Sequence, residues 1–112
     1  MKRKGQTPPD HLSDAAKRWW KSVVTDYELE PHHLKLLALA CESWDRTQQA
    51  RAILDREGIC VTDDRKNVRA HPAVAIEKDS RIAFARLVRE LDLDTEGPSD
   101  ARRPPPLRSN RG

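Results

Sequence analysis

Histidine and cysteine are the residue types of this 112-residue sequence that most readily ligate a metal or act as nucleophiles, and six such residues occur. They are His11, His32, His33, Cys41, Cys60 and His71. No two of them form a CxxC, HxxxH or HxH pattern, and adjacent histidines on a helix point about 100° apart. A zinc site needs several ligands that converge on one point, so this spacing argues against one. We therefore interpret the histidines as residues of helix starts and turns.

The other patterns that carry catalysis are missing as well. The sequence holds no GxxxxGK[ST] loop and no GxGxxG motif, so it signals no nucleotide site. Asp63 and Asp64 are the nearest approach to a magnesium site, but Arg65 and Lys66 follow them, which is more typical of a solvated turn. We predict a protein that is not an enzyme and has no cofactor and no metal. Its function is then binding and assembly.

The composition is 37% hydrophobic and 35% charged, too apolar for a disordered chain and too charged for a deep core. Two cysteines are too few for a disulfide framework, and neither a signal peptide nor an apolar run long enough to span a membrane is evident. We expect a protein of cytosolic character with no membrane partner. Its foldable middle of about eighty residues is marginal by itself, and association with copies of itself is one remedy.

Two helices are predicted in the first half of the chain. Ser13 is a good N-cap, and the apolar residues that follow recur at helical spacing, which predicts a helix over 13–26. Pro31 suits the first position of a second helix, which continues without glycine or proline until Gly58. This predicts a helix over 31–57, a rod of roughly 40 Å. Because it is apolar on more than one side, it needs more than one neighbour.

The second half predicts a hairpin and a third helix. Two short alternating segments surround an Asp- and Asn-containing turn, which indicates a β-hairpin over about 59–70, with an ordered loop as the alternative. Pro72 then opens a helix predicted over 72–92. The predicted fold is mainly α, assembling as a homo-oligomer.

The chain divides into three predicted regions. Residues 1–10 form a basic, flexible N-terminal arm, residues 11–94 form the helical domain, and residues 95–112 form an Arg/Pro-rich disordered tail. The formal net charge is only +3, so the distribution of cations is more informative than their sum. Basic ends on a compact body suit contact with an acidic polymer.

Three basic clusters are candidate DNA contacts: Lys2, Arg3 and Lys4; Lys17, Arg18 and Lys21; and Arg65, Lys66 and Arg69. Each cation placed on a phosphate adds affinity that is independent of base sequence and weakened by salt. One such cluster is more often a solvated surface than a binding site. Repetition of the clusters in an oligomer favours DNA binding, because weak contacts add through multivalency.

Large apolar residues supply the candidates for a subunit interface. Trp19 and Trp20 are adjacent in a helix and cannot both face the core, so we assign Trp19 to the interface. We also assign to this interface three residues that lie on the two apolar stripes of the long helix: Leu36, Leu39 and Trp44.

This pattern resembles the small terminase subunits of tailed double-stranded DNA bacteriophages, of the short helical type. The features that carry the resemblance extend from about residue 10 to residue 94. They are Leu12-Ser13-Asp14 with Trp20, the Ala- and Leu-rich helix from Pro31, Glu57-Gly58 before a β segment, and His71-Pro72-Ala73 before a helix that ends in Glu90-Leu91-Asp92-Leu93. Such proteins usually carry a glycine where Asp92 stands.

The resemblance implies a non-enzymatic component of viral DNA packaging that acts in the cytoplasm of the bacterial host. Its implied partners are double-stranded DNA, copies of itself in a ring, and the large subunit, which carries the ATPase and nuclease. Arg102 and Arg103 in the tail are the residues that we assign to the large-subunit contact.

Two other functions remain open at this point. One is a small helical DNA-binding regulator, although the long helix does not suit the recognition helix of a helix-turn-helix motif. The other is a helical adaptor that binds only protein, which the modest net charge permits.

Overall fold

The computed structural model describes residues 7–93. The predicted cluster of Lys2, Arg3 and Lys4 lies outside the described residues, as does the predicted tail with Arg102 and Arg103.

Three helices and one two-stranded sheet make up the described chain, which confirms the mainly α prediction. In chain order they are α1 (Asp14–Asp26), α2 (Pro31–Glu57), β1 (Cys60–Thr62), β2 (Val68–Ala70) and α3 (Pro72–Leu91). The bounds of α2 are those predicted. Helices α1 and α3 are each one residue shorter, because Ser13 and Asp92 are caps.

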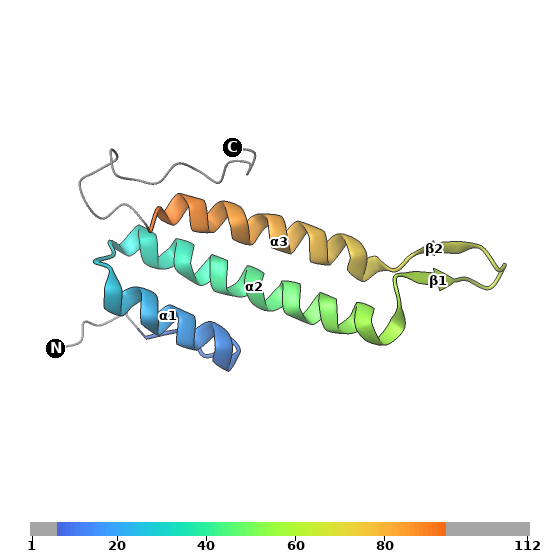
Figure 1. Cartoon of the computed structure of the whole chain (residues 1–112), viewed down its shortest axis with the longest axis horizontal. Coiled ribbons are helices and arrows are strands. Elements are labelled where there is room, and N and C mark those ends of the chain that lie inside the picture. Colours follow the sequence, from blue (N-terminus) through green and yellow to red (C-terminus); the bar gives the residue numbers. More distant parts are fainter. Residues whose placement is uncertain (1–6, 94–112) are drawn as a thin grey trace, which may run out of the picture.

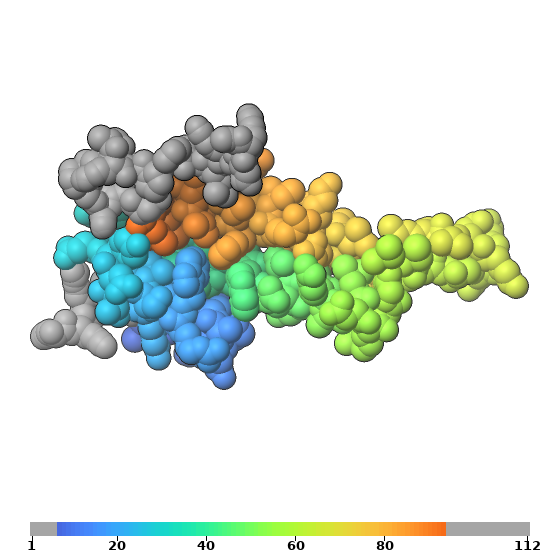
Figure 2. All heavy atoms as spheres, in the orientation of Figure 1, coloured from blue at the N-terminus to red at the C-terminus, as the bar shows by residue number. Residues whose placement is uncertain are grey.

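Helices α2 and α3 form a long antiparallel pair, and α1 packs beside the first part of α2 (Figure 1). The β-hairpin begins where α2 ends and extends away from the helices, at the opposite end of the pair from the α1–α2 turn (Figure 1). Figure 2 shows the hairpin as a narrow projection. The body is therefore three helices thick at one end and two helices thick at the other.

The predicted caps explain where the helices begin and end. Ser13 Oγ accepts a hydrogen bond from the Ala16 N–H (3.1 Å) and donates one to Asp45 Oδ1 (2.6 Å), so the cap of α1 also attaches α1 to α2. Gly58 ends α2 with a φ of +85°, a conformation that glycine adopts without steric cost. Asp92 ends α3 with a φ of +51°, and aspartate is among the few residues that tolerate this left-handed cap.

Two of the described histidines make hydrogen bonds at helix starts. His33 Nδ1 accepts from the Glu30 N–H (2.9 Å) at the start of α2, and His71 Nδ1 accepts from the Ala73 N–H (3.0 Å) at the start of α3. His71 Nε2 also lies 2.8 Å from Glu57 Oε1, joining the two ends of the hairpin connection. Residues 7–93 contain no group of three or more side chains able to hold a metal ion.

The hairpin is antiparallel, with Cys60 paired to Ala70 and Thr62 to Val68, so the ordered-loop alternative is wrong. Asp63 organises the turn, because its carboxylate accepts hydrogen bonds from the N–H groups of Arg65 (2.8 Å) and Asn67 (2.9 Å). Its carboxylate is thus occupied by its own turn.

The core lies at the three-helix end of the molecule. The buried residues of this cluster come from all three helices and the segment before α1: Leu12, Ala16, Trp20, Val23, Leu37, Cys41 and Leu91. At the two-helix end, the buried apolar residues are small, Ala50 and Ala73. No helix among the described residues is long and apolar enough to cross a membrane.

The two cysteines differ in reactivity because one lies in this core. Burial raises the pKa of the Cys41 thiol to about 12, with Asp45 and Glu42 adding to the effect, whereas Cys60 is exposed on β1. Thiolate is the reactive form. We expect a thiol reagent at pH 8 to label one cysteine of the native chain, at Cys60, and both after unfolding. Labelling of two cysteines without denaturant, read by mass spectrometry, would contradict the burial of Cys41.

Candidate assembly and DNA-binding surfaces

An apolar groove opens on the three-helix end of the surface. It is lined by Ala15, Ala16 and Trp19 of α1, Trp44 of α2 and Phe84 of α3, and its volume is about 320 Å³. The rings of Trp19 and Phe84 pack at 57° with centroids 5.7 Å apart, within the range favoured for tilted aromatic pairs. Aromatic side chains in a surface groove are typical anchors of protein interfaces.

The two adjacent tryptophans have different surroundings, as helix geometry predicts. Trp20 is 3% exposed in the core, whereas Trp19 is half-buried and lines the groove. The structure thus brings two of the predicted interface residues, Trp19 and Trp44, into one site. Nothing in the sequence connects Phe84, 40 residues after Trp44, with the two tryptophans.

The other two predicted interface residues do not join this groove. Leu36 is partly buried and packs against the core. Leu39 is 50% exposed and lies about 160° around α2 from the buried Leu37. It borders a second, shallower hollow of about 300 Å³, lined also by Glu42, Ser43, Arg46, Asp79, Ser80 and Ala83. The predicted interface is therefore divided between two faces of the molecule.

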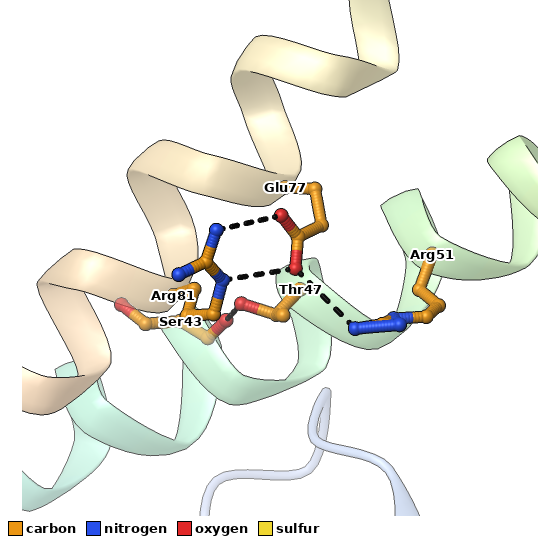
Figure 3. A network of polar contacts seen from close by, with 5 residues as sticks. All are labelled: Ser43, Thr47, Arg51, Glu77 and Arg81. Atoms are coloured by element: carbon orange, nitrogen blue, oxygen red, sulfur yellow. Dashed lines mark hydrogen bonds and ion pairs between the residues drawn. The ribbon is translucent and has the colours of Figure 1, made fainter. Parts of the chain in front are cut away.

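A polar network joins α2 and α3 (Figure 3). The Glu77 carboxylate accepts hydrogen bonds from Arg81 Nε (3.2 Å) and Nη2 (3.3 Å), and Arg51 Nη2 lies 3.7 Å away. The Glu77 side chain is 13% exposed. The spacing of four residues predicts a Glu77–Arg81 pair, but nothing in the sequence links Arg51 on the other helix to it.

Two carboxylates make the fold sensitive to acid. The hydrogen bond from Arg81 lowers the pKa of Glu77, and hydrogen bonds from His71 and then Arg56 lower the pKa of Glu57. A pKa lowered by folding stabilises the protein above the ordinary value of 4.5, and this contribution is lost as the pH falls through the folded pKa. We expect the melting temperature to fall below pH 4.5.

The Glu77→Gln variant isolates one of these contributions. It should melt below the wild type at pH 7, and this gap in melting temperature should narrow as the pH falls below 4.5 and through the lowered pKa of Glu77. A gap of constant size from pH 7 to pH 3, measured by circular dichroism, would contradict the ionic role of Glu77.

Two of the predicted basic clusters lie in the described chain, far apart from one another. Lys17, Arg18 and Lys21 lie on the face of α1 turned away from the core, whereas the hairpin cluster lies at the other end of the molecule (Figure 1). Arg65, Lys66 and Arg69 make up that cluster, and all are exposed.

None of these six cations makes an ion pair with a carboxylate among residues 7–93. They are accordingly available to an external anion. One copy does not join the two clusters in a continuous patch.

Comparison with known proteins places the chain in a family. The sequence profile described as phage terminase, small subunit, matches residues 16–105, about four fifths of the chain. No curated protein and no solved structure matches it significantly. The matched region includes most of α1 and the whole of α2, the hairpin and α3. The chain therefore belongs to the phage terminase small-subunit family, whose role is in the packaging of viral DNA.

Proposed function

We propose that this chain is the non-catalytic, DNA-binding subunit of a packaging motor. It assembles as a closed homo-oligomer in the cytoplasm of the infected host, holds viral double-stranded DNA, and regulates the large subunit that carries the ATPase and nuclease. The observation that carries the proposal is the pairing of an aromatic groove on one face with the exposed Leu39 beside a mostly polar hollow on another, on a body with exposed basic clusters.

The groove and the face at Leu39 support a head-to-tail interface. The groove of Trp19, Trp44 and Phe84 and the edge at Leu39 are different surfaces of one chain. A contact between two different surfaces leaves one free surface of each kind at the two ends of the assembly, so assembly continues until a ring closes. Burial of these faces also supplies the packing that a domain of this size lacks alone.

Ring assembly is what makes the basic clusters effective. Three cations bind DNA weakly, and their affinity falls with salt because each phosphate contact releases counterions. A ring repeats the clusters around its circumference, and the contacts then act together at high effective concentration. The α1 and hairpin clusters of every subunit thus contribute to one DNA-binding surface.

The contact with the large subunit is assigned to Arg102 and Arg103. Both lie outside the described residues, and the support for this assignment is their position in a basic, proline-rich segment. A short basic segment suits an acidic patch on a protein partner.

Salt-dependent DNA binding tests the proposal. We expect the wild type to bind double-stranded DNA with a logarithmic association constant that falls linearly with log[NaCl]. The variants Lys17→Gln/Arg18→Gln/Lys21→Gln and Arg65→Gln/Lys66→Gln/Arg69→Gln should each make this fall less steep, by about 0.9 in slope for each phosphate that the variant no longer neutralises.

Three results separate the alternatives. Binding that does not change with salt would contradict phosphate contact. No binding at all, with the oligomer intact, would favour an adaptor that binds only protein. Tight binding by a single chain would favour a small DNA-binding regulator.

A further inference from the structure

A line of cations runs along α3 on the side turned away from α2. Lys78, Arg86 and Arg89 are all exposed, together with Ile82, which is 39% exposed. At about 100° per residue these four side chains fall within about 80° of one another around the helix axis. We call this surface the α3 ridge. It is separate from the α1 and hairpin clusters, from the aromatic groove and from the hollow at Leu39.

Contacts on the other side of α3 fix this orientation. Ala73 and Leu91 are buried, and Phe84 lines the groove with Trp19 and Trp44. Arg81 is not part of the ridge, because its guanidinium is held by Glu77 on the side of α3 that faces α2 (Figure 3). The ridge residues therefore lie on the opposite side of α3 from the residues that pack against α1 and α2.

The ridge cations have no ion-pair partner in the described chain. No carboxylate of residues 7–93 lies within ion-pair distance of Lys78, Arg86 or Arg89. Two acidic residues of α3, Asp79 and Glu90, lie to one side of the ridge, and Asp79 borders the hollow at Leu39. The alanines at positions 75 and 85 are small and exposed, so a large ligand can approach the helix closely.

We infer that the α3 ridge is a third DNA-binding surface, which contacts the phosphate backbone of double-stranded DNA. This inference rests on the DNA binding proposed above. Lys78 and Arg89 are eleven residues apart, about 17 Å along the helix. That length is about half a turn of B-DNA, so a helix lying against the duplex places its cations on phosphates on either side of a groove. Arginine suits this contact because its planar guanidinium binds phosphate with two hydrogen bonds.

A second copy of the chain fits the ridge less well than DNA does. Packing of ridge against ridge would bring three cations of each copy together, and like charges across an interface are unfavourable. Ile82 is a single apolar side chain among them and offers little area to bury.

The test compares two variants of the full chain. Lys78→Gln/Arg86→Gln/Arg89→Gln neutralises the ridge. Lys35→Gln/Arg56→Gln is the control, with two exposed cations of α2 replaced that line neither the groove nor the hollow at Leu39. Each is measured for helicity, oligomer mass, and affinity for one duplex DNA over a range of NaCl concentrations.

The ridge variant should keep the helicity and mass of the wild type, and its slope of log K against log[NaCl] should be shallower by up to about 2.7, at about 0.9 per phosphate. The control should keep the wild-type slope. Arg86→Lys/Arg89→Lys, which retains the charge, should also keep most of the slope, which would show that the effect of the ridge variant is electrostatic.

An unchanged slope in the ridge variant, with salt-sensitive binding in the wild type, would overturn the inference and leave the proposed function intact. A changed oligomer mass with an unchanged slope would assign the ridge to a protein contact instead. Absence of DNA binding by the wild type would remove both the inference and the DNA-binding function.

Discussion

Replacement of Trp20 by alanine is expected to lower the free energy of unfolding by about 3–5 kcal/mol, the usual cost of removing a large aromatic side chain from a core. Trp20 is 3% exposed and lies in the single buried cluster that joins α1 to α2 and α3. Small domains have about 5–15 kcal/mol in total, so this one change removes a large part of the stability. Urea unfolding followed by circular dichroism at 222 nm measures the loss.

The adjacent tryptophan is the matched control for this measurement. Trp19 is half-buried and borders an open groove, so Trp19→Ala removes less buried surface and should cost clearly less stability in the isolated subunit. Equal losses for the two variants would mean that the core does not lie on the Trp20 side of α1.

Assembly, in contrast, should depend on the groove. The double variant Trp19→Ala/Trp44→Ala removes both tryptophans that line it and is expected to reduce the oligomer to single chains at micromolar concentration. Truncation of aromatic residues at the centre of an interface costs at least about 2 kcal/mol each, and a ring is weakened by that amount at every interface. Size-exclusion chromatography with light scattering measures the mass, and circular dichroism confirms that the helices remain.

Two controls make this second prediction specific. Ile59→Ala removes a side chain that is 65% exposed next to the hairpin, away from the groove, and should leave the mass unchanged. Leu39→Asp, on the other face, should dissociate the oligomer as the groove variant does. A mixture of the two dissociated variants should form heterodimers, because each keeps one intact surface of a head-to-tail contact. Failure of the mixture to associate would contradict the assignment of the two faces.

Local chemistry explains why the elements were predictable from the sequence. Pro31 and Gly58 mark the ends of α2, and Ser13 and His71-Pro72 mark the starts of α1 and α3. Each of these residues acts within about one helical turn of its own position, so the sequence alone contains the information. The same holds for the Asp63 turn, whose hydrogen bonds join residues at most four positions apart.

The surfaces were less predictable because they depend on how the helices pack. Periodicity places Trp44 and Phe84 on apolar faces, but only the docking of α1 brings both beside Trp19 in one groove. Periodicity also gives no sign that Arg51 of α2 lies within ion-pair distance of Glu77 of α3. The basic residues of α3 are scattered through an apolar pattern in the sequence. The packing of α3 shows which side of the helix faces outward, and three of these cations lie on that side.

The position of Asp92 shows how a departure from the usual pattern is accommodated. The resemblance drawn from the sequence leads us to expect glycine at position 92, and the aspartate there nevertheless adopts the left-handed conformation that ends α3. The helix therefore ends there despite the substitution.

The mass of the full chain in solution tests most directly whether the protein works as a closed oligomer. We predict one closed species whose mass is a fixed multiple, well above two, of the 12.8 kDa chain and does not change over a tenfold range of concentration. A mass of one or two chains in light scattering, from protein with the expected helicity, would contradict this prediction.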